Sequence, residues 1–154
     1  MPVVSSTIKS SQISSAKSNA QTIELAIKEA DAAISAKDNS VFPNASNGSL
    51  TLAEISKAKG IDSAVTASYS IDGKTYTAIY NNDDQKVYFA YKNGSKYTTF
   101  DSVDVPVAST NPKGVAELSA KTTTNNKTTY SVSTNVSFTG TGQATTSGGT
   151  TNTP

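Results

Sequence analysis

The stretch ISSAKSNAQTIELAIKEADAAI, residues 13–34, decides the fold of this chain. Its apolar side chains recur at alternating steps of three and four residues, the spacing that places them on one side of an α-helix. From residue 3 to about residue 37 the sequence contains neither glycine nor proline, so nothing interrupts the helix. We therefore predict an N-terminal helix over residues 1–37 with one buried stripe, formed by Ile13, Ala16, Ala20, Ile23, Ile27, Ala30 and Ile34.

Residues 38–63 are predicted to form a loop that contains a short second helix. Pro43 and the Asn-, Ser- and Gly-rich residues 44–49 are typical of a loop. Thr51 followed by Glu54 has the spacing of a capping box, which marks a helix start, and Gly60 is suited to the helix end.

From about residue 64 the apolar period changes to that of β-strands. Asp72-Gly73 and Asn93-Gly94 are dipeptides suited to tight hairpin turns, and the intervening residues 81–85 can close a longer one. Residues 115–121 fit either a strand or a helix, whereas residues 130–138 alternate apolar and polar side chains as one strand. Consecutive hairpins predict an antiparallel sheet over residues 64–138.

The sequence thus predicts an α+β fold, in which the long N-terminal helix packs its apolar stripe on the antiparallel sheet. Residues 1–138 would form one domain. The remaining residues, 139–154, are rich in Thr and Gly, and Ala144 is their one aliphatic side chain. A segment with so little to bury does not offset its ordering entropy, so we expect a flexible tail.

Composition excludes several classes of function. Lys+Arg 13 against Asp+Glu 12 leaves a net charge of +1, which does not predict a nucleic-acid partner. The chain has no Cys and no His, so thiolate and imidazole chemistry is excluded, and we expect neither a cofactor nor enzymatic activity. The oxygen-rich loop 81–84 lacks the frame of a calcium-binding EF-hand, so a solvated turn is the expected structure.

The first turns of the helix carry a second apolar face. Val4 and Ile8 lie roughly 100° around the helix from the buried stripe, and Leu25 falls on the side opposite to it. One interpretation is a frayed end with incidental apolar residues. The other is an assembly interface, directed at a partner, composed of Pro2, Val3, Val4, Ile8 and Leu25.

Met1-Pro2-Val3-Val4, the polar-faced helix up to Lys37 and the following antiparallel sheet together resemble a type IV pilin. The chain is similar to the soluble head of such a pilin, cut at the proline that follows its hydrophobic N-terminal segment. Pro2 matches the family's helix-kinking proline. In the family, the preceding segment carries the peptidase recognition sequence and an assembly glutamate, and it anchors the subunit in the membrane. The motif covers residues 2 to about 37, and the rest resembles the family in architecture.

The resemblance implies a non-catalytic structural subunit of a cell-surface filament used in adhesion, twitching motility or biofilm formation. Its partners would be copies of itself and related pilins, and it would be membrane-anchored before assembly. A chain without cysteine is more similar to the pilins of single-membrane bacteria.

Two alternatives stay open. One is a pseudopilin of a secretion or DNA-uptake system, although the calcium site of major pseudopilins needs acidic residues and Glu117 is the last acid in this chain. The other is a free adhesin-like module that binds a host or surface glycan through a row of tyrosines: Tyr69, Tyr76, Tyr80, Tyr88, Tyr91 and Tyr97.

Overall fold

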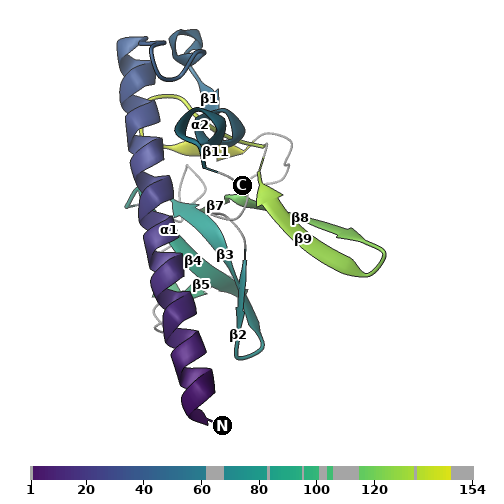
Figure 1. The fold of residues 1–154 in the computed structure, drawn as a ribbon. Coiled ribbons are helices and arrows are strands. Elements are labelled where there is room, and N and C mark those ends of the chain that lie inside the picture. Colours follow the sequence, from purple (N-terminus) through teal and green to yellow (C-terminus); the bar gives the residue numbers. More distant parts are fainter. Residues whose placement is uncertain are drawn as a thin grey trace.

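The computed structural model describes residues 2–61, 68–82, 84–94, 96–100, 104–105, 115–133 and 135–146, and in the first helix it describes side chains from Ser10 onward. A long helix lies along one side of a set of antiparallel sheets, with a short second helix beside it (Figure 1). The α+β class and the second helix were both predicted from the sequence. In chain order the elements are α1 (Pro2–Ala36), the 3-10 turn η1 (Ala45–Asn47), β1 (Leu50–Thr51), α2 (Leu52–Lys59), β2 (Tyr69–Ile71), β3 (Lys74–Asn81), β4 (Lys86–Asn93), β5 (Lys96–Thr99), β6 (Asp104–Val105), β7 (Val115–Glu117), β8 (Ser119–Thr124), β9 (Lys127–Val132), β10 (Val136–Phe138) and β11 (Ala144–Thr146).

Helix α1 is capped at its C-terminal end, and helix α2 is capped at its N-terminal end. At the end of α1, Lys37 adopts a positive φ of 56°, its N–H donates to Ile34 C=O, and Asp38 N–H donates to Ala33 C=O. These two bonds form a Schellman motif, which satisfies carbonyls that the helix leaves without a partner. At the start of α2, Thr51 and Glu54 form the predicted capping box, with Glu54 N–H donating to Thr51 Oγ1 at 3.1 Å.

The largest sheet has the order β2-β3-β4-β5-β6, and β7 pairs with the remaining length of β3. Strands β2 to β5 form a meander, as the hairpin signals predict. Asp72 and Gly73 have φ values of 53° and 79°, so both turn residues have the positive φ that a type I′ turn requires.

The strands after β7 do not extend this sheet, so the prediction of one sheet over residues 64–138 is wrong. β8 pairs with β9 alone, while β10 joins β1 and β11 in a separate three-stranded sheet. The run 130–138 is accordingly two strands. It breaks at Ser133, whose N–H donates to Leu118 C=O and whose Oγ accepts from Asn135 N–H.

The core lies between α1 and the strands. All of the stripe from Ala16 to Ile34 is buried, with Ile23 and Ile27 each 1% exposed, and Ile13 is partly buried at its edge. Alternation along β3 sends Ala78 and Tyr80 into this core and Ile79 to a smaller cluster with Ala90 and Val105. The larger core continues into the three-stranded sheet, chiefly through Leu50, Val136 and Phe138.

The segment 139–146 is ordered in the structure, so the prediction of a flexible tail beginning at residue 139 is wrong for these residues. β11 pairs with β10, and Ala144 is buried. The amide side chain of Asn82 accepts from Ala144 N–H at 2.6 Å and donates to its C=O at 3.3 Å. Hydrogen bonds to distant parts of the chain, and not burial alone, therefore fix this segment. Residues 147–154 lie outside the described residues.

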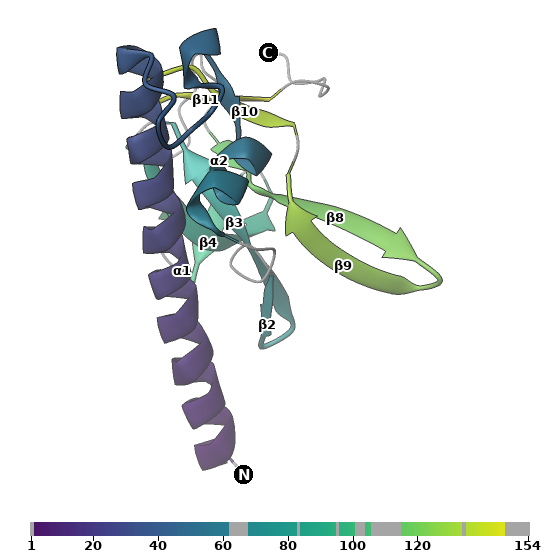
Figure 2. The same cartoon turned by 45° about the horizontal axis from the view of Figure 1, so that its top comes forward.

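β8 and β9 form a hairpin arm, residues 119–132, that projects from the rest of the fold (Figures 1 and 2). Its turn is formed by Asn125 and Asn126, whose φ values are 54° and 64°. The described side chains from Lys121 to Thr129 are all exposed, whereas Ser119 at the base is buried. Only the base of the arm belongs to the folded core.

Ile27→Ala tests the central packing of α1. The side chain is 1% exposed, so its truncation removes buried methyl groups and leaves a cavity, and we expect a loss of about 2–5 kcal/mol in unfolding free energy by denaturant titration. The matched control on the same helix is Leu25→Ala, at a residue that is 59% exposed, for which we expect a change within about 0.5 kcal/mol. Equal effects at both positions would contradict this packing.

Truncation tests the ordered C-terminal segment. A chain that ends at Phe138 loses β11 and the Asn82–Ala144 hydrogen bonds, so its thermal midpoint should fall by roughly 5 °C or more. A chain that ends at Thr146 is the control and should unfold close to the full chain, because residues 147–154 offer no aliphatic or aromatic side chain. An unchanged midpoint for the shorter chain would restore the tail interpretation.

Candidate interaction surface on helix α1

Helix α1 has two parts with different surroundings. From Ala16 to Ile34 one side of the helix is buried by the sheets, and the first turns extend past the β2–β3 hairpin toward the N-terminus (Figures 1 and 2). At the boundary Ser10 and Ser11 are exposed, while Ile13 is partly buried. The helix is therefore longer than the fold that it supports.

The proposed assembly residues divide between these two parts. Pro2, Val3, Val4 and Ile8 belong to the helical backbone of the extending turns, but their side chains lie outside the described residues. Leu25 lies within the packed part and is 59% exposed, on the side opposite to the core stripe. It is a large apolar side chain on a helix face whose other exposed residues are polar or alanine.

The side of α1 that faces away from the sheets consists mainly of small polar residues. The serines at positions 10, 11, 14, 15 and 18 are all exposed. Short side chains leave the helix backbone accessible to close approach by another element. On a helical wheel Lys17 and Lys28 lie to one side of Leu25 and Glu29 to the other. Sequence reasoning did not identify these three charges as part of a surface.

The acidic side chains of α1 are engaged within the chain. Glu24 Oε1 accepts from Val87 N–H of β4 at 3.1 Å, and its other oxygen lies 3.4 Å from Lys28 Nζ. Glu29 forms an ion pair of 2.5 Å with Lys59 of α2. The bond to Val87 joins α1 to β4, whereas the two ion pairs are at the surface and contribute little to stability.

A third acid, Asp31, holds the C-terminal segment against α1. Its Oδ1 accepts from Gly140 N–H at 3.0 Å, and Ser35 Oγ donates to Gly140 C=O at 3.1 Å. Burial raises the pKa of Asp31 above its ordinary value, an effect that the hydrogen bonds from the Gly140 and Gly142 amides only partly offset. The sequence showed an acid next to the buried stripe but not its partner, because 109 residues separate the two.

Gly142 has a backbone conformation that favours glycine, and a side chain there would have to displace the end of the Gln85 side chain. Its φ is 76°, and a Cβ there would lie 2.5 Å from Gln85 Nε2. Tyr80 donates from its hydroxyl to Gly142 C=O at 2.7 Å, and burial raises the pKa of that hydroxyl. The C-terminal segment is thus seated on both α1 and β3.

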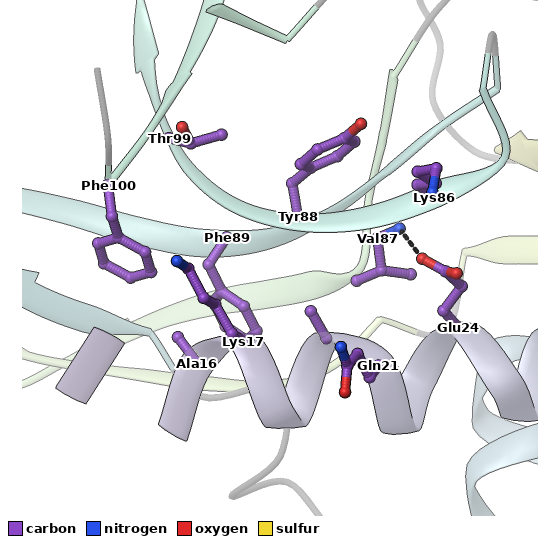
Figure 3. Close-up of a pocket in the computed structure, with 11 residues that line it drawn as sticks. Ala16, Lys17, Gln21, Glu24, Lys86, Val87, Tyr88, Phe89, Thr99 and Phe100 are labelled. Carbon is purple, nitrogen blue, oxygen red and sulfur yellow. Dashed lines mark hydrogen bonds between the residues drawn. The ribbon is translucent and has the colours of Figure 1, made fainter. Parts of the chain in front are cut away.

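A groove of about 450 Å³ lies between α1 and strands β4 and β5. Figure 3 shows Val87 and Phe89 directed from the sheet toward the helix, with Gln21 on the helix and the Glu24–Val87 hydrogen bond at one end. Glu24 is the single acid in the lining, and it already accepts from the backbone. Two lysines, Lys17 and Lys86, also line the groove, so it combines apolar packing with basic side chains at its rim.

The tyrosines that could have formed an exposed row pack within the sheet. None of the six is exposed: Tyr76 and Tyr80 are buried and the others are partly buried. Tyr76 stacks on Phe100 with ring centroids 4.3 Å apart, and Tyr97 donates to Glu117 at 2.8 Å. The described residues therefore present no row of ring faces on which sugars could stack.

The oxygen-rich loop between β3 and β4 forms hydrogen bonds within the chain that stabilise the turn. Asn81 and Asn82 are buried, and Asp84 accepts from Lys86 N–H and from the Tyr88 hydroxyl. Within the described ranges no three acidic side chains gather as a metal site would require. Neither described helix has the length and apolar character to cross a lipid bilayer.

Comparison with protein-family models, curated proteins and solved structures finds no match for this chain. The functional inference therefore rests on the chain's own residues. Among its described surfaces, the side of α1 opposite the core combines an exposed large apolar residue, a run of small polar side chains and separated charges.

The ionisation of Asp31 should affect stability in a defined direction. Because its pKa is raised in the folded chain, folding favours the protonated carboxyl, and this contribution is lost as pH rises through the folded pKa. The unfolding free energy of the wild type minus that of Asp31→Asn should therefore fall as pH is raised from 3 to 6, measured by denaturant titration at each pH. A difference that rises over this interval would mean that hydrogen bonding to Gly140 outweighs desolvation.

Proposed function

We propose that this chain is the head of a type IV pilin, a non-catalytic subunit that polymerises into a cell-surface filament. In this proposal an apolar segment precedes Pro2, anchors the subunit in the membrane before assembly and then packs in the filament core. The partners are copies of the same subunit and related pilins. The filament would serve adhesion, twitching motility or biofilm formation.

The observation that carries the proposal is the mismatch between the length of α1 and the extent of its packing. The helix has 35 residues, which corresponds to about 52 Å. Among the side chains that the structure describes in α1, from Ser10 onward, the buried stripe begins at Ala16, with Ile13 at the edge. A helix that served its own domain alone would have no need for the preceding turns, which carry Val3, Val4 and Ile8.

Two further observations support the same proposal. Leu25 is exposed although the other long aliphatic side chains described in α1 are buried or partly buried. The exposed serines at positions 10 to 18, on the same side of the helix but nearer its N-terminus, would let a neighbouring helix approach closely, because small side chains permit short interaxial distances. Both features fit a helix that contacts the sheets on one side and other subunits on the other.

One feature favours a second function. The β8–β9 arm is exposed over most of its length and is rich in threonine, as a surface-binding module could be. In a filament the arm would still be displayed outward, so binding and polymerisation do not exclude each other. A free module, however, would leave the extended turns of α1 without a role.

The gene sequence upstream of Pro2 separates these possibilities at once. A short basic leader, a peptidase site and an apolar run that ends at this proline would support the pilin. A cleavable secretory signal followed directly by Pro2 would favour the free binding module.

The assembly role of the first turns is tested by Val4→Asp combined with Ile8→Asp. In the native host the full-length double variant should form few or no filaments, counted by electron microscopy, because charged groups do not pack in an apolar helical core. The thermal midpoint of the 154-residue chain should stay nearly unchanged, since these turns precede the buried stripe.

A matched control is Ser6→Asp with Ser10→Asp, which places the same charges at the same spacing on the opposite side of the helix. This control variant should form nearly as many filaments as the wild type. Normal filaments from the Val4/Ile8 variant would show that the assembly role is mistaken. A large fall in its midpoint would show that these residues belong to the core.

A further inference from the structure

The exposed surface of α1 has two flanks of opposite charge. On the helical wheel Lys28 and Lys17 lie roughly 60° and 80° to one side of Leu25, and Glu29 lies roughly 40° to the other. All three charged residues are exposed, and the side chains of Lys28 and Glu29 are 61% and 51% accessible. Lys17 also lines the groove between α1 and strands β4 and β5, where Figure 3 shows it directed toward the strands. Glu24 and Asp31, the other acids of α1, are turned toward the sheets and are not fully exposed.

We propose that the Lys17/Lys28 flank of α1 in one copy of this chain contacts the Glu29 flank of α1 in the next copy, with Leu25 between them. This inference rests on the proposed filament and adds which surfaces meet in it. The partner is a second copy because the chain carries both complementary flanks on one helix.

The arrangement of the flanks determines the relative direction of the two helices. If the two helices ran antiparallel, through a two-fold axis perpendicular to them, each flank would face its own equivalent, which would place Lys beside Lys and Glu beside Glu. Opposite charges meet only when different flanks face each other. Different flanks face each other when the two helices run parallel, so the contact requires neighbouring copies whose α1 helices point in the same direction, as they would along a filament.

The charges of α1 also fit poorly with an isolated helix. Its first turn has no acidic residue and its last turn no basic residue, so neither end complements the helix dipole. Residues 2–23 carry only Lys9 and Lys17, whereas three acids and Lys28 lie between residues 24 and 36. With respect to the helix dipole, this distribution gains nothing within one subunit. Between parallel helices of neighbouring copies it provides attraction across the flanks.

The existing ion pairs do not prevent this contact. Lys28 pairs with Glu24 at 3.4 Å and Glu29 with Lys59 at 2.5 Å, but both pairs are at the surface, where exchange of partners has a small cost. Burial between subunits would lower the local dielectric and strengthen the new pairs. The interaction should weaken in high salt, because screening acts on exposed charges.

Exchange of the flank charges tests the proposal in full-length protein in the native host. Glu29→Lys makes both flanks basic, and Lys17→Glu with Lys28→Glu makes both acidic. Each change should lower the filament yield about fivefold or more, the factor that corresponds to roughly 1 kcal/mol. The triple variant, which exchanges the signs of both flanks, should recover most of the yield, whatever the axial offset between neighbouring helices.

Lys59→Ala is the control, since it removes the intrachain partner of Glu29 and leaves the α1 flanks unchanged. It should form filaments like the wild type. Thermal unfolding of the 154-residue chain, measured for every variant, separates misfolding from failed contact. The proposal would be overturned if the triple variant formed as few filaments as Glu29→Lys and the Lys17→Glu/Lys28→Glu variant. Normal filaments from either of these two variants would also overturn it. If the wild type forms no filaments, the pilin function itself fails, and that outcome is distinct.

Discussion

The packing of one side of α1 against the sheets is the interaction on which the rest of this structure depends. Ala16, Ala20 and Ala30 are short enough to bring the helix close to the strands, while Ile23, Ile27 and Ile34 fill the space between them. Strand β4 contributes Val87 and Phe89 to the same core, and the hydrogen bond from Val87 N–H to Glu24 fixes the helix along the strand. Because the stripe runs over six helical turns, the helix must stay continuous for all of it to be buried.

The sequence predicted the local features of this fold well. The stripe, the capping box at Thr51 and Glu54, and the Asp72-Gly73 turn each depend on residues that are near neighbours, so their patterns are visible without the fold. The predictions failed where contacts between residues far apart in the sequence determine the strand boundaries or the order of a segment. Alternation over residues 130–138 could not indicate that Leu118 would bind Ser133 and separate two strands. Composition alone suggested a tail after residue 138, because the segment is ordered by Asp31 and Asn82, which are remote in the chain.

The candidate surface was predictable only in part for a related reason. The helical wheel places Leu25 opposite the core, and the structure leaves it exposed. The charged flanks can be recognised as one surface only when it is known which side of α1 the sheets cover. Glu24 and Glu29 are similar in sequence context, yet one accepts from a strand backbone and the other lies at the surface. What would cover Leu25 in the proposed filament depends on neighbouring subunits, and the periodicity of one chain contains no information about subunit order.

The β8–β9 arm has a consequence for how the sequence can vary. Its two strands satisfy each other's hydrogen bonds, and its turn lies far from α1, so residues 121–129 are under little constraint from the core. Such a hairpin can open locally at a small free-energy cost while the helix and sheets remain folded. Homologous chains could therefore differ freely in length and composition at Asn125 and Asn126. The same turn is a natural place to insert a foreign peptide epitope for display, since an insertion there would extend the loop without entering the fold.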